Sequence, residues 1–145
     1  MLKKLACAAL IATAFGATGC ASVPMASPEA DKAAKAFTVD SSKANLYIYR
    51  SESFGAAIKM PVLLDNAGIG STAAKTYIFR QVDPGQHIII SNTENTATLT
   101  VDAKAGQNHF VWQEVKMGAF SAGSALHLVD EAKGKAEVAK CKLVQ

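Results

Sequence analysis

From residue 44 onward, apolar and polar positions alternate along short segments of the chain. This period of two is typical of β-strands, whose successive side chains point to opposite faces of a sheet. The predicted strands are residues 44–50, 60–65, 69–72, 76–82, 86–92, 96–102, 108–117 and 124–129, with an edge strand at residues 140–144. Short strands spaced about ten residues apart are typical of a β-sandwich or a small barrel. We predict a mainly β, antiparallel sandwich of the immunoglobulin kind in one domain over residues 44–145.

Two short helices are predicted beside the strands. Ser27 can cap a helix over residues 28–36, because its hydroxyl accepts from the first free amides and Pro28 suits the first turn. Residues 130–139 form a second, weaker candidate, since Gly134 costs about 1 kcal/mol in a helix interior.

The N-terminal segment has a different pattern, which indicates export. Lys3 and Lys4 precede an uncharged stretch at residues 5–15, and small residues then lead to Cys20. Residues 17–20 (ATGC) resemble the bacterial lipobox, with Ala17 where that motif usually has leucine. We therefore predict a lipoprotein signal peptide over residues 1–19, with diacylglycerol and an acyl chain attached to Cys20.

A lipid anchor on Cys20 would place the protein in the cell envelope, and two alternatives compete with this prediction. Ala21 is not an aspartate, which by analogy with enteric bacteria favours the outer membrane over the inner one. Residues 20–43 would be a lipidated tether whose helix either rests on the domain through Phe37 or holds it off the bilayer. The alternatives are an uncleaved membrane helix over residues 5–27 and ordinary cleavage that releases a periplasmic protein.

Composition limits the possible partners. The 145 residues are 50% hydrophobic and 19% charged, which excludes wholesale disorder. The formal charge is +3, and it falls to +1 without Lys3 and Lys4, so no nucleic-acid partner is predicted. Cys7 leaves with the signal peptide and Cys20 is modified, so Cys141 has no internal disulfide partner. Its place in the alternating C-terminal strand predicts burial, with a redox role or an intermolecular disulfide as the alternative.

Four features occur together in order: LYIYR at residues 46–50, the turn at residues 82–87, the turn at residues 104–107 before an aromatic strand, and LHLVD at residues 126–130. In this combination, the chain resembles an uncharacterised family of Gram-negative lipoproteins with a PEGA-like β-sandwich domain, over residues 44–144. The resemblance implies a fold and a location in the envelope. It implies no chemistry and no site residue.

The residues offer little support for catalysis or cofactor binding. His87, His109 and His127 lie far apart in predicted strands without metal-ligand spacing, and a structural role is expected for each. The sequence has no nucleophile elbow and no phosphate-binding glycine loop. Asp65, Asp83 and Asp102 stand at strand ends, where turn capping explains them. No metal, cofactor or catalytic residue is predicted, apart from the covalent lipid on Cys20.

Two glycine-containing loops carry the remaining candidate surface. Residues 53–58 and 118–123 each place a phenylalanine among small residues, and both follow odd-numbered strands. If strands alternate in direction, both loops emerge at one end and form a binding rim of Phe54, Ile58, Met117 and Phe120. In the alternative, both phenylalanine rings fold back over the core. Phe110 and Trp112 are expected in the core rather than on a ligand platform.

These observations favour a periplasm-facing envelope lipoprotein that acts as a non-catalytic, membrane-tethered module. It would bind an envelope protein or peptide, or support an assembly, and it would contact the bilayer through Cys20. One alternative is a carrier of a small apolar or lipid-like ligand at the end of the sandwich that bears Phe54 and Phe120. An enzyme is the least supported reading.

Overall fold

The computed structural model of the protein describes residues 20–145. The predicted signal peptide, residues 1–19, lies outside the described residues. Among the described residues, no helix has the length and apolarity needed to cross a membrane. Residues 20–27, which belong to the alternative membrane helix, are extended rather than helical.

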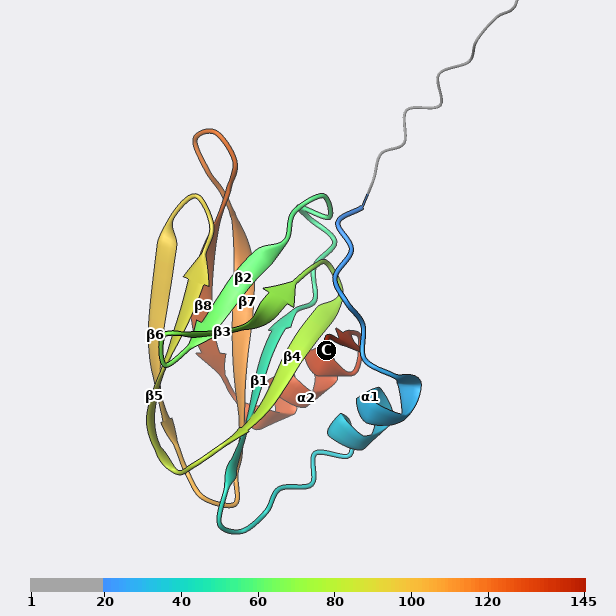
Figure 1. The fold of residues 1–145 in the computed structure, drawn as a ribbon, viewed down its shortest axis with the longest axis vertical. Coiled ribbons are helices and arrows are strands. Elements are labelled where there is room, and N and C mark those ends of the chain that lie inside the picture. The colour runs from blue at the N-terminus through green and yellow to red at the C-terminus, as the bar shows by residue number, and fades with distance from the viewer. Residues whose placement is uncertain (1–19) are drawn as a thin grey trace, which may run out of the picture.

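Within residues 20–145, nine strands form two sheets, and two short helices flank them (Figure 1). The elements are α1 (Pro28–Ala34), β1 (Ala44–Arg50), β2 (Met60–Leu64), β3 (Ala67–Thr72), β4 (Thr76–Val82), β5 (Gly85–Asn92), β6 (Thr96–Ala103), β7 (Asn108–Met117), β8 (Ala122–Val129), α2 (Glu131–Val138) and β9 (Lys142–Leu143). One sheet has the order β8-β7-β1-β4-β9 and the other the order β3-β2-β5-β6. The predicted mainly β sandwich is confirmed, and the predicted element bounds differ from these by at most two residues at either end.

Two strand pairs depart from the predicted antiparallel arrangement. β1 pairs with β7 in parallel, with Tyr47 opposite Phe110, and β4 pairs with β9 in parallel. Parallel neighbours need a long connection, and between β1 and β7 the chain supplies it by building the whole of the second sheet. Because β1 and β7 run the same way, the loops that follow them emerge at the same end of the sandwich.

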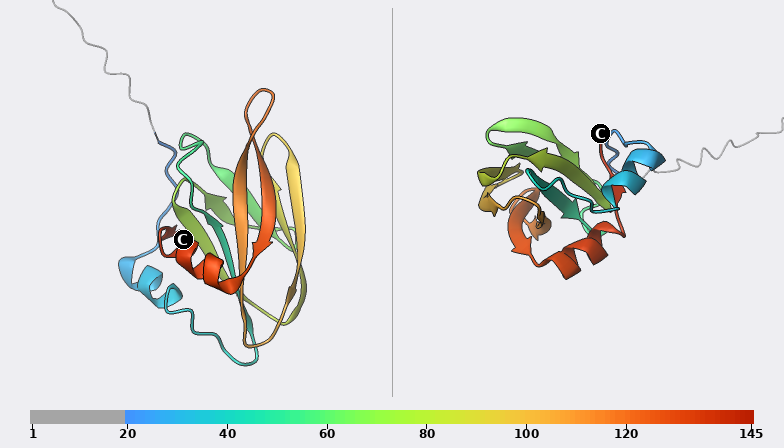
Figure 2. Two further views of the ribbon diagram at one scale, coloured as in Figure 1. Left: turned by 180° about the vertical axis from the view of Figure 1, so that it is seen from behind. Right: turned by 90° about the horizontal axis from the view of Figure 1, so that it is seen from below.

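β1 is buried along its whole length because it has cover on both faces. Leu46 and Ile48 point into the apolar core between the two sheets. Tyr47 and Tyr49 lie on the opposite face, in a second cluster to which α1 and α2 contribute Ala34 and Val138. Seen from below, both helices lie against this outer face of the five-stranded sheet (Figure 2).

Helix α2 packs so closely that it requires its glycine. A Cβ atom at Gly134 would lie 2.1 Å from Cγ of Phe110, so no larger residue fits without displacement of the ring. The propensity cost predicted for Gly134 is therefore exchanged for close contact with the sheet.

Helix α1 rests on the domain. The Tyr47 hydroxyl donates to the carbonyl oxygen of Ala34 at 2.8 Å, and the Tyr77 hydroxyl donates to the Asp31 carboxylate at 2.9 Å. The rings of Phe37 and Tyr47 lie 5.4 Å apart. Of the two arrangements considered for this segment, the structure has the one in which Phe37 contacts the domain.

Candidate functional site

The segment after Cys20 is fixed to the body of the domain. The Ala21 amide donates to the carbonyl oxygen of Ala56 at 2.9 Å, in the loop after β1. Further along, the Ala26 amide donates to Leu143 O at 3.0 Å, and Met25 forms a bridge with Val144. The segment thus extends the edge of the five-stranded sheet beyond β9. Cys20 is exposed at its start and is joined directly to this docked backbone.

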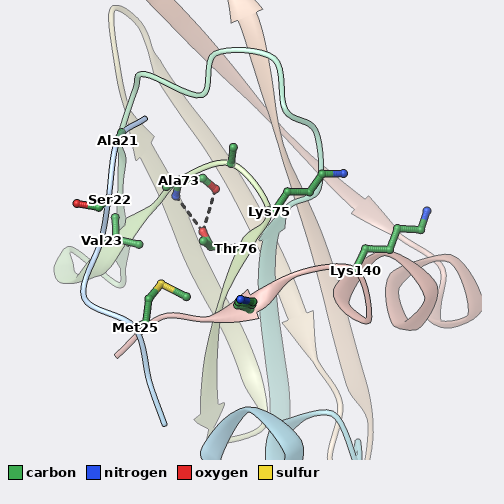
Figure 3. A pocket seen from close by; sticks show the side chains of 10 residues that line it. Ala21, Ser22, Val23, Met25, Ala73, Lys75, Thr76 and Lys140 are labelled. Atoms are coloured by element: carbon green, nitrogen blue, oxygen red, sulfur yellow. Dashed lines mark hydrogen bonds between the residues drawn. The ribbon is translucent and has the colours of Figure 1, made fainter. Parts of the chain in front are cut away.

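A surface cleft of about 360 Å³ lies beside this segment (Figure 3). Its lining comes from residues 21–25, the turn between β3 and β4, and the C-terminal lysines. The Thr76 hydroxyl accepts from the Ala73 amide at 2.9 Å and donates to the Ala73 carbonyl oxygen at 2.9 Å. The buried Thr76 hydroxyl is thus engaged within its own turn, and the side chains of Lys75 and Lys140 extend away from residues 21–25 (Figure 3).

We use the term loop pole for the end of the sandwich formed by residues 51–59, between β1 and β2, and residues 117–121, at the end of β7 and in the loop before β8. In Figure 1 and in the rear view of Figure 2, both loops lie at the end where the described chain begins. The bond between Ala21 and Ala56 places Cys20 at this same end. The loop pole and the predicted lipid site are therefore neighbours.

Three of the four residues of the predicted rim are exposed at the loop pole. The exposed fractions are 55% for Phe54, 84% for Met117 and 99% for Phe120. The alternative in which both phenylalanine rings fold back over the core is wrong. Ile58 is only half-buried and leans over its own loop, where its Cδ1 lies 2.9 Å from the position that a Cβ atom of Gly55 would occupy.

A buried cation holds the loop that carries Phe54. Arg50 is fully buried, and its guanidinium donates to the carbonyl oxygens of Gly55 at 2.5 Å, Ile58 at 2.9 Å and Phe54 at 3.1 Å. Gly55 has a φ of +69°, a conformation that favours glycine. The loop backbone is thus wrapped around one side chain.

An exposed anion holds the loop that carries Phe120. The Glu94 carboxylate, in the turn between β5 and β6, accepts from the amides of Ala119 at 2.7 Å, Phe120 at 3.0 Å and Ser121 at 2.5 Å. The amides of Ser121 and Phe120 keep the pKa of Glu94 below its usual value. The loop therefore leans on the β5–β6 turn and not on the loop of Phe54.

A polar chain lies inside the sandwich beneath the loop pole. Gln113 is fully buried, accepts from the Thr72 hydroxyl at 2.5 Å, and donates to Ser91 Oγ at 2.7 Å. Ser124 continues the chain by donating to Ser91 Oγ at 2.8 Å. These bonds join the two sheets through side chains at positions where the core is otherwise apolar.

The histidines have structural partners. His87 contacts the Asp65 carboxylate at 2.6 Å and the carbonyl oxygen of Asp83 at 2.7 Å. His127 contacts Glu114 at 2.8 Å, and Nε2 of His109 accepts from a turn amide at 2.9 Å. Within residues 20–145, no group of three or more histidine, cysteine or acidic side chains is placed to hold a metal ion.

The remaining candidates from the sequence also have defined surroundings. Cys141 is buried, as predicted, and burial raises the pKa of its thiol to about 12, so it stays protonated near neutral pH. Phe110 lies in the core. Trp112 is half-buried and donates through Nε1 to the Glu52 carboxylate at 3.0 Å. Asp83 forms an ion pair with Lys43 at 2.5 Å, and Asp102 with Lys104, at the end opposite the loop pole.

Arg50 and Glu94 are the functional candidates that the sequence analysis missed. Arg50 had a usable signal, because Leu46 and Ile48 set the inward-facing positions of β1 and Arg50 continues them. A charge at such a position needs acceptors inside the fold. Glu94 lies in a turn, where the sequence gives no indication of its partners 25 residues later.

Comparisons with known proteins place the chain in a family. The family described as "Protein of unknown function (DUF2846)" matches residues 40–125. A protein of Haemophilus influenzae, named as an uncharacterized protein, is 33% identical over 138 residues, which cover 94% of this chain and 82% of that protein. No solved structure matches the chain.

Proposed function

The chain belongs to the DUF2846 family of proteins of unknown function, and from this premise we propose that it is an envelope lipoprotein whose β-sandwich is a non-catalytic, membrane-tethered module. The proposal assigns the lipid to Cys20 and the periplasmic side of the outer membrane to the domain. The loop pole is its binding rim.

The observation that carries the proposal is the position of Cys20. This thiol is exposed at the start of the described chain, directly before backbone that is bonded to the domain. A lipid-modifying enzyme needs a thiol that it can reach. The lipobox-like residues 17–20 supply the small side chains that such an enzyme accepts.

The surroundings of the titratable groups support a non-catalytic module. General acid–base or nucleophilic chemistry needs groups that converge on a substrate position. Here His87 and His127 are engaged with carboxylates, and Cys141 is buried with a raised pKa. These contacts give each group a structural role.

The loop pole supports binding in preference to ligand transport. The cleft beside the loop before β8 has a volume of about 230 Å³, and its lining includes Glu94, Asn95 and Lys116. A carrier of apolar molecules needs about 300 Å³ or more enclosed among apolar side chains. This cleft is smaller, and the 360 Å³ cleft beside residues 21–25 is a surface cleft with Lys75 and Lys140 in its lining. Exposed aromatic side chains on ordered loops suit a surface contact instead.

Two cysteine variants test the anchor. In a Gram-negative host grown with labelled palmitate, we expect label on the wild-type chain and on Cys141→Ala, and none on Cys20→Ser. Intact mass should show the lipid on the first two proteins, and density-gradient fractionation should place them in the outer membrane. Label on Cys20→Ser, or a mature chain with only the mass of its amino acids, would contradict the proposal.

A further inference from the structure

We propose that the loop pole is a membrane-contact surface, with Phe54, Met117 and Phe120 inserted among the headgroups of the bilayer that holds the Cys20 lipid. The inference rests on the proposed function, since the bilayer is brought to this end of the domain by that lipid. It names lipid, rather than an envelope protein, as the partner of the rim.

The first argument is that no free length of chain separates Cys20 from the domain. The Ala21 amide is bonded to Ala56 O at 2.9 Å, and one residue of extended chain spans at most about 3.6 Å. A lipid on Cys20 therefore holds Ala56 at the bilayer surface. Phe54 lies two residues away in the same loop, and the loop of Phe120 extends from the same end of the sandwich (Figures 1 and 2).

The charge pattern of the two loops is the second argument. Residues 53–58 and residues 117–123 contain no charged side chain. An exposed lysine borders each uncharged loop, Lys59 after the first and Lys116 before the second. The nearby carboxylates are each engaged within the protein: Glu52 accepts from Trp112 Nε1 and the Val115 amide, Glu114 pairs with Lys116, and Glu94 accepts from the amides of residues 119–121. Uncharged tips with cations at their base match a bilayer, in which an apolar interior lies beneath anionic headgroups.

Several backbone groups of each loop are already hydrogen-bonded, which is the third argument. Backbone polar groups that enter an apolar layer must find partners within the protein. The carbonyl oxygens of Phe54, Gly55 and Ile58 accept from Arg50. The amides of residues 119–121 donate to Glu94. Insertion therefore leaves these backbone groups paired within the protein, and the exposed side chains are presented on ordered backbone.

Two matched alanine positions allow a direct test with the full, lipidated chain. Ala119 lies exposed at the loop pole, and Ala105 lies exposed in the β6–β7 turn at the opposite end. Each is changed to cysteine and labelled with a nitroxide, while Cys141 is buried and Cys20 carries the lipid. The protein is reconstituted in vesicles of phosphatidylethanolamine and phosphatidylglycerol, and collisions with oxygen and with a water-soluble nickel chelate are measured.

We expect the ratio of oxygen to nickel collisions to be several-fold higher for Ala119→Cys than for Ala105→Cys. Adding Met117→Asp and Phe120→Asp to the Ala119→Cys chain should bring its ratio down toward that of the control. Intact mass of the same samples reports the lipid.

The outcomes separate the two proposals. Equal ratios at the two positions in a chain with lipid overturn the membrane contact and leave the anchor in place, whereas a chain without lipid overturns both. In native envelope membranes, protection of the Ala119→Cys label from both reagents would show a protein on the rim and would also overturn the membrane contact.

Discussion

The two loops of the loop pole are held in opposite ways. Beneath the loop of Phe54, Arg50 is a buried cation that donates to three carbonyl oxygens. Beneath the loop of Phe120, Glu94 is an exposed anion that accepts from three amides. Both arrangements present an exposed phenylalanine on ordered backbone, although the charge and the depth of the holding side chain are reversed.

The difference in burial between Arg50 and Glu94 determines how easily each loop can open. Opening the loop of Phe54 would leave the Arg50 guanidinium buried without acceptors, which costs several kcal/mol, so this loop is coupled to the core. Opening the loop of Phe120 returns the Glu94 carboxylate and three amides to water, which solvates them well. The first loop is therefore part of global stability, and the second can move while the sandwich stays folded.

The largest expected effect is that of Arg50→Met. Methionine keeps the apolar stem but removes the donors of three carbonyl oxygens, and each loss costs about 1 kcal/mol. We expect the free energy of unfolding to fall by about 3 kcal/mol in urea titrations. Arg50→Lys, which keeps the charge but can serve fewer carbonyls, should fall between this variant and the wild type.

Arg80→Met is the matched control for Arg50→Met. Arg80 also donates to two carbonyl oxygens, of Phe79 at 2.7 Å and Ile69 at 2.6 Å, but it is only half-buried. Water can replace it, so we expect a loss of about 1 kcal/mol. Equal losses for the two methionine variants would show that the burial of Arg50 does not set the size of its effect.

Gly118→Ala is expected to have an intermediate effect, on the other loop. A Cβ atom at Gly118 would lie 2.2 Å from Ser121 O and 2.3 Å from Glu94 Oε2, so the loop and its anion must separate. Because this loop opens at little cost, we expect a loss of no more than about 1 kcal/mol in urea titrations. Gly68→Ala is the control, because nothing lies within 4 Å of its Cβ position. A loss below that of Gly68→Ala would mean that the loop accommodates the methyl group.

Sequence periodicity is sufficient to locate the strands, but it does not predict which elements pack against their faces. Alternation identified β1 correctly, yet both of its faces are buried, because α1 and α2 cover Tyr47 and Tyr49. A pattern of two tells which residues share a face but not what lies against it. Likewise, the parallel pairing of β1 with β7 depends on where the chain crosses between sheets, which no local pattern encodes.

The candidate site was predictable in part for the same reason. The positions of Phe54 and Phe120 at one end followed from counting strands, and their exposure did not. Exposure depends on the contacts of Arg50 and Glu94 with backbone atoms, which are independent of the side chains of the loop. A loop sequence does not indicate which side chains bind its backbone atoms. Of the two contacts, only that of Arg50 could have been suspected, because its charge faces inward on β1.

The smallest effect is expected for Glu94→Gln, which changes only the hydrogen bonds between this exposed side chain and the amides of residues 119–121. The amide side chain accepts more weakly than a carboxylate and can serve fewer of the amides of residues 119–121. Hydrogen exchange of these amides should become about tenfold faster, while the midpoint of global unfolding stays at its wild-type value. A shifted midpoint would show that Glu94, like Arg50, is coupled to the core.

Acid should reproduce this variant in the wild-type chain and separate the two loops. The loop amides hold the pKa of Glu94 below its ordinary value of 4.5. The hydrogen bonds from these amides to the ionised carboxylate are therefore fully formed above that pH and are lost as the pH falls through the lowered pKa. The amide resonances of residues 119–121 should titrate together in this range and should not titrate in Glu94→Gln. Arg50 stays charged throughout, so the Ile58 amide, bonded to Gly55 O at 3.0 Å, should keep its resonance position. Movement of both sets of resonances at one midpoint would mean that the loop pole opens as a single unit.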